Sequence, residues 1–592
     1  MAAKKPGKPN RIEPWLEVTE GSAPVLLIAP HGGRAAFAPG AMLHPKVNDL
    51  HTAEITRELA ARLGATAFIN SGMDRNRIDC NRVVQLSAHA PWLIEMIADR
   101  LEQLVARNGR ALALIVHGWN VIEPRVDLGL GLKSHADGLR VHGQACVSAS
   151  DEFINGPLAD LVERLRREGV IPTFGLRYPA GGKENLLQAF TERHRESPIE
   201  PLARLGRLAA GGALDAVQLE LSVGVRWPGR IRDRSIEIIA DTLSRRPGSS
   251  RQSSVPTTVM RTRAKPAAKP PARARIAPAP PVRVGVEFFD PTARLGVMAS
   301  FDLGHGAIGA RIMLLIDGRR VALFTSEGKP ELDLQRIAHG PLALRTDGDR
   351  IVLEFKGPTL VTPDGIGYLS VEHALAQGDL EEAVDIAMSM RLDAASDDLQ
   401  GLLAGFQNVI QANAAPVGFG SVTGMIRFDG RMQEIDAIGR IGVSFTNIGA
   451  TRFRSRRMLW AHFPNDSKLS AVEARTLAHS DGSEEPTARL FAGTQASECQ
   501  VDTLDLEISS PSTPPGSFSA LLTPPGGRPS LLRGEPESFL PLSRPGPDLT
   551  RIHTSLGFAT FRLGDHEGAG MYEYSHCAEP AGASDDSSND DD

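Results

Sequence analysis

A basic, proline-rich segment divides this chain and limits what it can fold into. Between Arg245 and Arg283 there are ten Lys and Arg residues and no Asp or Glu, whereas the whole chain has a net charge of −6. Large apolar side chains are scarce there, so the segment cannot bury enough surface to offset its loss of conformational entropy. Its prolines and like charges favour an extended chain. We therefore expect a linker over residues 245–282 with a folded domain on each side.

Length and composition narrow the class of protein further. The chain has 592 residues, and one core rarely grows beyond roughly 250–300 residues, so several domains are expected. No apolar run reaches the roughly 18–20 residues that cross a bilayer, and no secretory signal is present at the N-terminus. The four cysteines lie far apart in sequence, which suits a reducing compartment. We expect a cytoplasmic protein without a transmembrane segment.

The linker itself carries no aromatic residue and no amphipathic repeat. Its charge alone therefore does not lead us to expect nucleic-acid binding. The expected organisation comprises five parts: a flexible N-terminus (residues 1–22), an α/β domain (23–244), the linker (245–282), a β domain (283–577) and an acidic disordered tail (578–592).

Before the linker, short apolar runs alternate with segments whose apolar residues recur at helical spacing. Residues 24–29 and 111–116 are short apolar runs of the kind found in buried strands. Residues 52–63 place apolar side chains at helical spacing and stop at Gly64, and residues 232–243 repeat the pattern. This alternation predicts an open, mostly parallel sheet with helices on both faces.

The pattern changes after the linker. Short runs of alternating apolar residues are separated by Asp-Gly pairs at Asp317, Asp347 and Asp429. Such pairs between strands are a strong hairpin signal. We expect mainly antiparallel β structure here, a sandwich or a barrel, with a helix predicted over residues 375–390.

Two histidines follow predicted strands of the first domain. His31 lies in Pro-His-Gly-Gly and His117 in Val-His-Gly, at the edge where open α/β sheets bind ligands. Two imidazoles beside glycines suit zinc, which needs a third protein ligand. Asp49, His51 and Glu54 lie between the two histidines and supply candidates.

Two further polar features belong to this domain. Residues 74–82 contain three arginines and two aspartates, and arginine forks bind carboxylates bidentately. Glu220 lies on an otherwise apolar predicted strand, where a carboxylate needs a partner or a chemical role. Beside a metal it could act as the general base that activates water.

Taken in order, these motifs resemble those of the N-formylglutamate amidohydrolase family, which is similar in fold to zinc carboxypeptidases. The resemblance covers roughly residues 24–243 and rests on five motifs: Pro-His31-Gly-Gly, Asp49 to Glu54, Asp79-Cys-Asn81-Arg82, Ile-Val-His117-Gly and Gln218-Leu-Glu220. It implies a hydrolase that depends on Zn²⁺ and cleaves a C–N amide bond of an N-acyl amino acid or a related compound. A ligand-binding protein with a degenerate hydrolase domain is the alternative.

The resemblance also implies a set of metal ligands. His31 and His117 would bind Zn²⁺, with Glu54 as the third ligand and Asp49 as its rival. The family commonly has Ser after the first His-containing turn, where this chain has Gly32. Its second turn reads His-Ser, where this chain reads His-Gly-Trp119, and these changes in the pocket wall point to a substrate other than formylglutamate.

Roles in substrate binding and catalysis follow from the same resemblance. Asn81 and Arg82 would hold a carboxylate of the substrate. Arg77 would stabilise the oxyanion of the tetrahedral intermediate. Glu220 would take a proton from the attacking water and then give one to the leaving amine.

The second domain carries a weaker resemblance. Residues 420–430 and 434–440 read as a repeating strand pair, and residues 568–575 close the β region. Together they resemble the lipocalin-like β domains of the hydroxyneurosporene synthase type. That resemblance implies a cavity for an apolar ligand, and a sandwich filled by its own side chains is the alternative.

Overall fold

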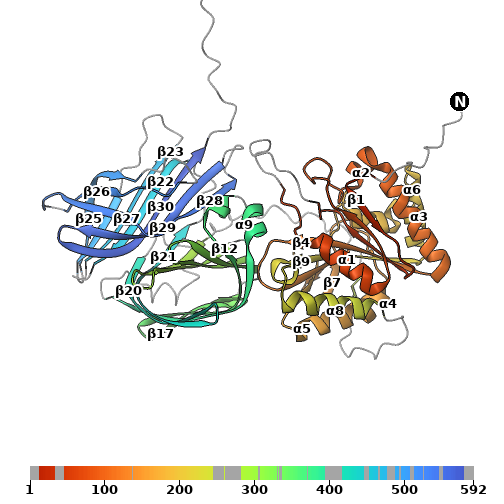
Figure 1. Cartoon of the computed structure of the whole chain (residues 1–592), viewed down its shortest axis with the longest axis horizontal. Helices are drawn as coiled ribbons and strands as arrows, with labels where there is room; N and C mark the ends of the chain where they lie inside the picture. The colour runs from red at the N-terminus through yellow and green to blue at the C-terminus, as the bar shows by residue number, and fades with distance from the viewer. Residues whose placement is uncertain are drawn as a thin grey trace, which may run out of the picture. The chain divides into compact units, whose positions relative to one another are not determined.

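The computed structural model divides into two compact units, one formed mostly by residues up to Arg273 and the other mostly by residues from Ala274 onward (Figure 1). The described residues are 13–33, 46–135, 138–244, 259–260, 282–304, 307–329, 331–332, 336–369, 371–393, 417–445, 453–463, 467–476, 487–492, 495–506, 513–524, 526–545 and 551–578. The start of the predicted N-terminal segment, nearly all of the predicted linker and the acidic tail beyond Ala578 lie outside them.

A seven-stranded sheet forms the centre of the first unit. Its strands, in spatial order, are β1 (Leu16–Thr19), β3 (Thr66–Asn70), β2 (Val25–Ala29), β4 (Ala111–Trp119), β9 (Leu214–Ser222), β5 (Arg125–Gly129) and β8 (Ile171–Phe174). The four central strands β3, β2, β4 and β9 run parallel, while β1 and β5 run antiparallel to their inner neighbours. All residues of β2 and β9 are buried, as expected for strands covered on both faces. The predicted open, mostly parallel sheet is confirmed.

Helices cover both faces of this sheet (Figure 1). One apolar core holds side chains of α1 (Thr52–Leu63), α5 (Ala159–Arg167) and α8 (Arg230–Ser244), and the other holds those of α2 (Val83–His89), α3 (Pro91–Asn108) and α6 (Glu200–Ala210). Helix α1 ends at Gly64, whose φ of 63° gives the left-handed cap that glycine favours. Smaller elements are β6 (Leu132–His135), β7 (Gly138–Val141), α4 (Asp151–Phe153), a π-helix (Ile154–Leu158), two 3₁₀ helices (Leu186–Phe190, Glu192–His194), α7 (Val223–Arg226) and β10 (Val259–Met260).

Two short strands extend this unit beyond the expected limits of residues 23–244. Strand β1 pairs with β3 and buries Leu16, although the sequence predicted a flexible segment there. Strand β10, which lies inside the predicted linker, pairs with β7 of the first unit. Strands of four and two residues bury too little apolar surface to leave a periodic pattern, so their pairing could not be read from sequence.

The second unit consists of two antiparallel sheets, each closed by an extra pairing. The first has the order β14-β13-β12-β11-β21-β20-β19-β18-β17-β16-β15, and β14 also pairs with β18. The second has the order β27-β26-β25-β24-β23-β22-β30-β29-β28, and β27 also pairs with β29. The predicted antiparallel β domain is confirmed, with sheets that close on themselves as in a barrel.

The bounds of these strands follow the chain. The first sheet contains β11 (Val282–Asp290), β12 (Leu295–Gly304), β13 (Ala307–Ile316), β14 (Arg320–Gly328), β15 (Glu331–Leu332), β16 (Arg336–His339), β17 (Leu342–Asp347), β18 (Arg350–Thr362), β19 (Asp379–Leu392), β20 (Val417–Phe428) and β21 (Arg431–Phe445). The second contains β22 (Phe453–His462), β23 (Ser467–Thr476), β24 (Thr487–Ala492), β25 (Gln495–Asp505), β26 (Phe518–Thr523), β27 (Ser530–Pro536), β28 (Leu540–Pro545), β29 (Arg551–Leu563) and β30 (His566–Ala578).

Asp-Gly pairs form the hairpins that the sequence predicts. Asp317 and Gly318 connect β13 to β14 with φ of 55° and 70°, and Asp429 and Gly430 connect β20 to β21 with φ of 51° and 69°. Positive φ at both central residues is the geometry of a type I′ turn, which matches the twist of the flanking strands.

The prediction of a helix over residues 375–390 is wrong. A 3₁₀ turn (Ile366–Leu369) and a short helix α9 (Val371–Gln377) precede Gly378, and the chain then continues as strand β19. The buried residues of its second half alternate with more exposed ones: Val384, Ile386, Met388 and Met390. Pairing with β18 and β20 therefore overrides the helix propensity of its Ala, Glu and Met residues.

Apolar side chains pack between and within the sheets of the second unit. One cluster includes Phe518, Phe561 and Tyr572, and another includes Phe289 and Phe558, whose rings stack 5.0 Å apart. The predicted cavity for an apolar ligand in this unit stays a prediction. Among the described helices of the whole chain, none combines the length and apolarity needed to cross a bilayer.

Candidate metal centre

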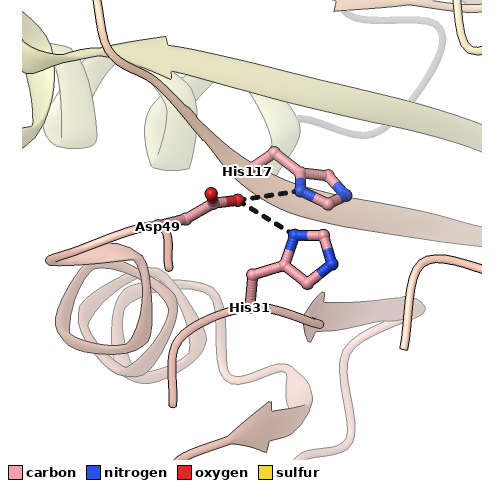
Figure 2. Close-up of side chains that lie close together, drawn as sticks. All are labelled: His31, Asp49 and His117. Atoms are coloured by element: carbon pink, nitrogen blue, oxygen red, sulfur yellow. Dashed lines mark hydrogen bonds and ion pairs between the residues drawn. The ribbon is translucent and has the colours of Figure 1, made fainter. Parts of the chain in front are cut away.

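Three buried side chains converge at the carboxyl edge of the first sheet. His31 directly follows the Pro30 turn after β2, Asp49 precedes α1, and His117 lies near the end of β4 (Figure 2). Two hydrogen bonds fix Asp49, because the Thr52 side chain donates from Oγ1 to its carbonyl oxygen (2.6 Å) and the Gly118 main-chain amide donates to its Oδ2 (3.0 Å). The fold thus brings together residues from three separate segments.

Both imidazoles aim the same ring nitrogen at one carboxylate oxygen. The Nδ1 atoms of His31 and His117 lie 3.2 Å and 3.0 Å from Asp49 Oδ2 (Figure 2). One potential ligand atom from each residue falls within 4.8 Å of the others. This is a donor set of two nitrogens and one oxygen, the kind that holds catalytic zinc.

A further layer of side chains holds these residues in place. His31 Nε2 lies 2.7 Å from Asp79 Oδ1, and Lys46 Nζ lies 2.9 Å from Asp79 Oδ2. Arg75 donates to Asp49 Oδ1 (3.1 Å). A carboxylate on the outer nitrogen of a histidine fixes its tautomer and ring orientation, and it leaves the inner nitrogen free to bind metal.

The protonation states also fit a metal. Burial lowers the pKa of His117 to about 4 despite the nearby Asp49 carboxylate, so its ring is neutral at pH 7. Burial would raise the pKa of Asp49, but the His31 and His117 rings outweigh it and hold that pKa well below its usual range. Within the described part of the chain, the buried Nε2 of His117 has no hydrogen-bond partner. A neutral imidazole and an ionised carboxylate are the forms that bind zinc, and the nitrogen of His117 that faces Asp49 is Nδ1, not Nε2.

Glu220 lies in the same row of the sheet as His117. Across the parallel pair β4–β9 it is opposite His117, and across the antiparallel pair β9–β5 it is opposite Asp127. Residues opposite one another on paired strands project to the same face. Burial raises the pKa of Glu220 well above its usual value, and the charges of Asp49 and Asp127 add to this. Its Oε1 accepts a hydrogen bond from Gln218 Nε2 (2.7 Å).

Asp127 ties the loop after β8 to this row. Its Oδ1 accepts from Thr173 Oγ1 (2.7 Å) and the Leu176 amide (3.0 Å), and its Oδ2 accepts from the amides of Arg177 (2.9 Å) and Tyr178 (2.8 Å). Four donors satisfy a fully buried carboxylate, so Asp127 stabilises the loop instead of offering a free oxygen.

The structure separates the sequence-predicted site residues into two groups. It brings His31 and His117 together with Asp49, and it places Glu220 beside them. It does not bring Glu54 or Arg77 into the site, because both are exposed. Glu54 is the third residue of α1 and faces outward, so Asp49, the rival ligand, takes its place in the group.

Asn81 and Arg82 lie on the side of the site formed by Asp79. The Asn81 amide donates to Asp79 Oδ1 (3.1 Å), and Arg82 Nε lies 3.8 Å from Asp79 Oδ2. The buried Oδ1 of Asn81 has no partner among the described residues, whereas Arg82 is exposed. Their role in holding a substrate carboxylate stays a prediction.

Sequence reasoning assigned no role to Asp79, Arg75 or Asp127. Asp127 could have been found by the signal that singled out Glu220, since it is a carboxylate between the apolar residues Val126 and Leu128. Arg75 and Asp79 belong to the polar segment 74–82, but nothing in their order shows which of its arginines points inward.

Asp79→Asn is expected to weaken zinc binding by about 10–100-fold, the usual effect of removing a carboxylate behind a metal-bound histidine. The amide keeps the size of the side chain but loses the charge that faces His31 Nε2. Isothermal titration of the metal-free protein with zinc measures the change. Asp74→Asn in the same segment is the control. An unchanged zinc affinity in Asp79→Asn would contradict the role of Asp79 in holding His31 in place.

Comparisons with known proteins give distant likenesses only. No protein-family model matches the chain, and neither does any curated protein. Among solved structures, an AttH candidate from Nitrosomonas europaea is similar over 50% of this chain and 91% of its own, at 11% identity and a TM-score of 0.33. Kievitone hydratase from Nectria haematococca is similar over 50% of this chain and 89% of its own, at 9% identity and a TM-score of 0.31.

N-formylglutamate amidohydrolase from Ralstonia eutropha JMP134 is similar to the N-terminal half. The likeness covers 38% of this chain and 94% of that protein, at 14% identity and a TM-score of 0.26. Likenesses this distant carry no functional conclusion, and the lipocalin-like resemblance of the second unit stays a prediction. We therefore base a function on the side chains of the site.

Proposed function

We propose that this protein is a zinc-dependent hydrolase that cleaves the C–N amide bond of an N-acyl amino acid or a related compound. One observation carries the proposal: His31 and His117 direct their Nδ1 atoms at the same oxygen of buried Asp49, with Glu220 opposite His117 in the next strand. A zinc ion held by these three residues would polarise the amide carbonyl and make water more acidic.

Glu220 supplies the proton chemistry in this proposal. Its Oε atoms would take a proton from the attacking water and pass it to the nitrogen of the leaving amine, since the C–N bond breaks only after that nitrogen gains a proton. Its raised pKa shows that it holds a proton readily in this environment. A divalent cation beside Asp49 would act in the opposite direction and lower that pKa.

Arginine and asparagine side chains would contact the substrate. Arg75 already contacts Asp49, and it is better placed than exposed Arg77 to stabilise a developing oxyanion. Asn81 and Arg82 would hold a carboxylate of the substrate, as the family resemblance implies. Trp119, two residues beyond His117, packs edge-on against Tyr178 at 5.8 Å, and this aromatic pair favours a substrate larger than a formyl derivative.

Two other expectations remain part of the proposal. The second unit would bind an apolar ligand, either the acyl group of a substrate or a separate molecule. None of the four cysteines, all within the described residues, forms a disulfide, which fits the cytoplasmic location expected from their spacing.

Zinc removal tests the proposal on the full-length protein. We expect one zinc per chain by elemental analysis, hydrolysis of at least one member of an N-acyl amino acid panel, loss of both after chelation, and recovery when zinc is added back. Release of the free amino acid is the readout for hydrolysis. A purified protein that binds no zinc would refute the proposal. Stoichiometric zinc without hydrolysis across the panel would favour the alternative, a ligand-binding protein with a degenerate hydrolase domain.

A further inference from the structure

A fully buried arginine lies beside the segments of two proposed ligands, Asp49 and His117, and is unused by the proposed chemistry. Arg226 is the last residue of α7, the short helix that directly follows β9, and none of its side chain is exposed. Its NH1 donates to the Leu50 carbonyl (2.6 Å), and its NH2 donates to Asn120 Oδ1 (2.9 Å) and to the Trp119 carbonyl (3.3 Å). These acceptors are main-chain carbonyls and one side-chain amide.

The acceptors belong to two of the three segments that carry proposed metal ligands. Leu50 directly follows Asp49, and Trp119 follows His117 by two residues. The planar guanidinium holds its donors in a fixed fork, so bonds to both segments restrict the distance between them. A single side chain from a third part of the sequence thus joins the Asp49 segment to the His117 segment.

Gly118 makes this arrangement possible. A Cβ atom at that position would lie 2.5 Å from Arg226 NH1 and 2.9 Å from Asp49 Cβ, closer than real Cβ contacts come. Any larger residue would therefore push Arg226 or Asp49 away. The Gly118 amide also donates to Asp49 Oδ2, so the close approach of the guanidinium and the position of the carboxylate depend on the same glycine.

The charge of Arg226 is compensated locally. Burial lowers its pKa to about 10, against the effect of the nearby carboxylates of Asp49 and Glu220, so it stays charged at neutral pH. Its guanidinium also lies 5.2 Å from the ring of Trp227, a distance at which a cation and an aromatic face attract. Removing Arg226 would take away the hydrogen bonds that it donates to its three acceptors, and a buried acceptor without a partner destabilises the structure around it.

We propose that Arg226 is a positioning residue of the metal centre: by bonding the Asp49 segment and the His117 segment it sets the spacing between these two ligands and so the affinity for zinc. The inference rests on the proposed function for its zinc readout. Arg226 contacts neither substrate nor metal in this proposal. Its effect passes through the main chain beside the two ligands.

Full-length Arg226→Met, Arg226→Lys and Gly118→Ala variants test this role. We expect zinc affinity to fall at least tenfold in Arg226→Met and in Gly118→Ala, and Arg226→Lys to recover part of the loss because an ammonium can still donate to one carbonyl. The control is Arg204→Met, which removes an arginine that joins α6 to α3 through Glu102, and it should bind zinc within twofold of wild type.

A second readout does not need metal. Hydrogen exchange at the Gly118 amide of the metal-free protein reports directly on its bond to Asp49, and we expect exchange at least tenfold faster in Arg226→Met but unchanged in Arg204→Met. Wild-type zinc affinity and wild-type exchange in a folded Arg226→Met protein would overturn the inference. Equal losses in Arg204→Met would overturn it too, because they would reflect general destabilisation. If the wild-type protein binds no zinc, the proposed function fails, and the exchange rates still decide whether Arg226 joins the two segments.

Discussion

Asp49→Ala is expected to weaken zinc binding by more than about 100-fold, whereas Glu54→Ala is expected to leave it unchanged. Residues behind a metal ligand typically contribute about 10–100-fold to affinity, and a ligand itself should contribute more. Asp49 Oδ2 lies near the Nδ1 atoms of both histidines, while Glu54 is exposed on the outer side of α1. Competition with a chromogenic zinc chelator measures both variants on one scale.

The Glu54 variant is the matched control, because it removes a carboxylate five residues away without touching the buried site. Thermal unfolding of the metal-free proteins checks that Asp49→Ala is folded, since Asp49 also accepts bonds from Arg75 and Gly118. Loss of zinc in Glu54→Ala with retention in Asp49→Ala would reverse the assignment and restore the ligand that the family resemblance favoured.

The choice between these two carboxylates shows where sequence information ends. Both lie between the two histidines, and helical periodicity predicted α1 correctly over residues 52–63. Which carboxylate faces the sheet depends on the turn before the helix, where His51 takes a left-handed φ of 66°. That conformation is rare for a residue other than glycine. No pattern in the sequence predicts this conformation, which directly precedes α1 and thus affects how Asp49 and Glu54 are oriented relative to each other.

The architecture was more accessible than the site because it depends on repeated signals. Apolar runs separated by segments of helical periodicity predicted the parallel sheet of the first unit. Asp-Gly pairs predicted hairpins in the second. Strand β19 was missed because its Ala, Glu and Met residues favour helix locally, and its partners β18 and β20 reach it only through the fold. Pairings between distant segments, such as β14 with β18, also have no local signature.

The residues that support the site were hidden for a different reason. Asp79, Arg75 and Arg226 act through contacts with segments far away in sequence, and these contacts leave no local pattern around any of the three. Arg226 lies 176 residues from Leu50, whose carbonyl it binds. Sequence order can suggest which residues are chemically suitable, but only the packing of β4, β9 and the start of α1 shows which of them meet.

Glu220→Gln is expected to lower the turnover number for amide hydrolysis by about 10²–10⁴-fold, the usual contribution of a general acid or base. The amide keeps the shape of the side chain and can still bond to Gln218, but it cannot accept a proton from water. Zinc content should stay at the wild-type level, because Glu220 is not among the three grouped ligand residues. Steady-state kinetics on the best substrate of the panel, with zinc measured on the same samples, gives both quantities.

Asp215→Asn is the matched control for that experiment, since Asp215 is a buried carboxylate on the same strand whose Oδ2 accepts a bond from Arg110. It should change stability without a comparable change in turnover. A Glu220→Gln enzyme that keeps its turnover within tenfold of wild type would show that the carboxylate serves the packing of β9 and not the chemistry. A variant that loses zinc and turnover together would instead place Glu220 among the groups that hold the metal. A variant that keeps its zinc but loses turnover therefore distinguishes a working hydrolase site from a buried network of charges made of the same residues.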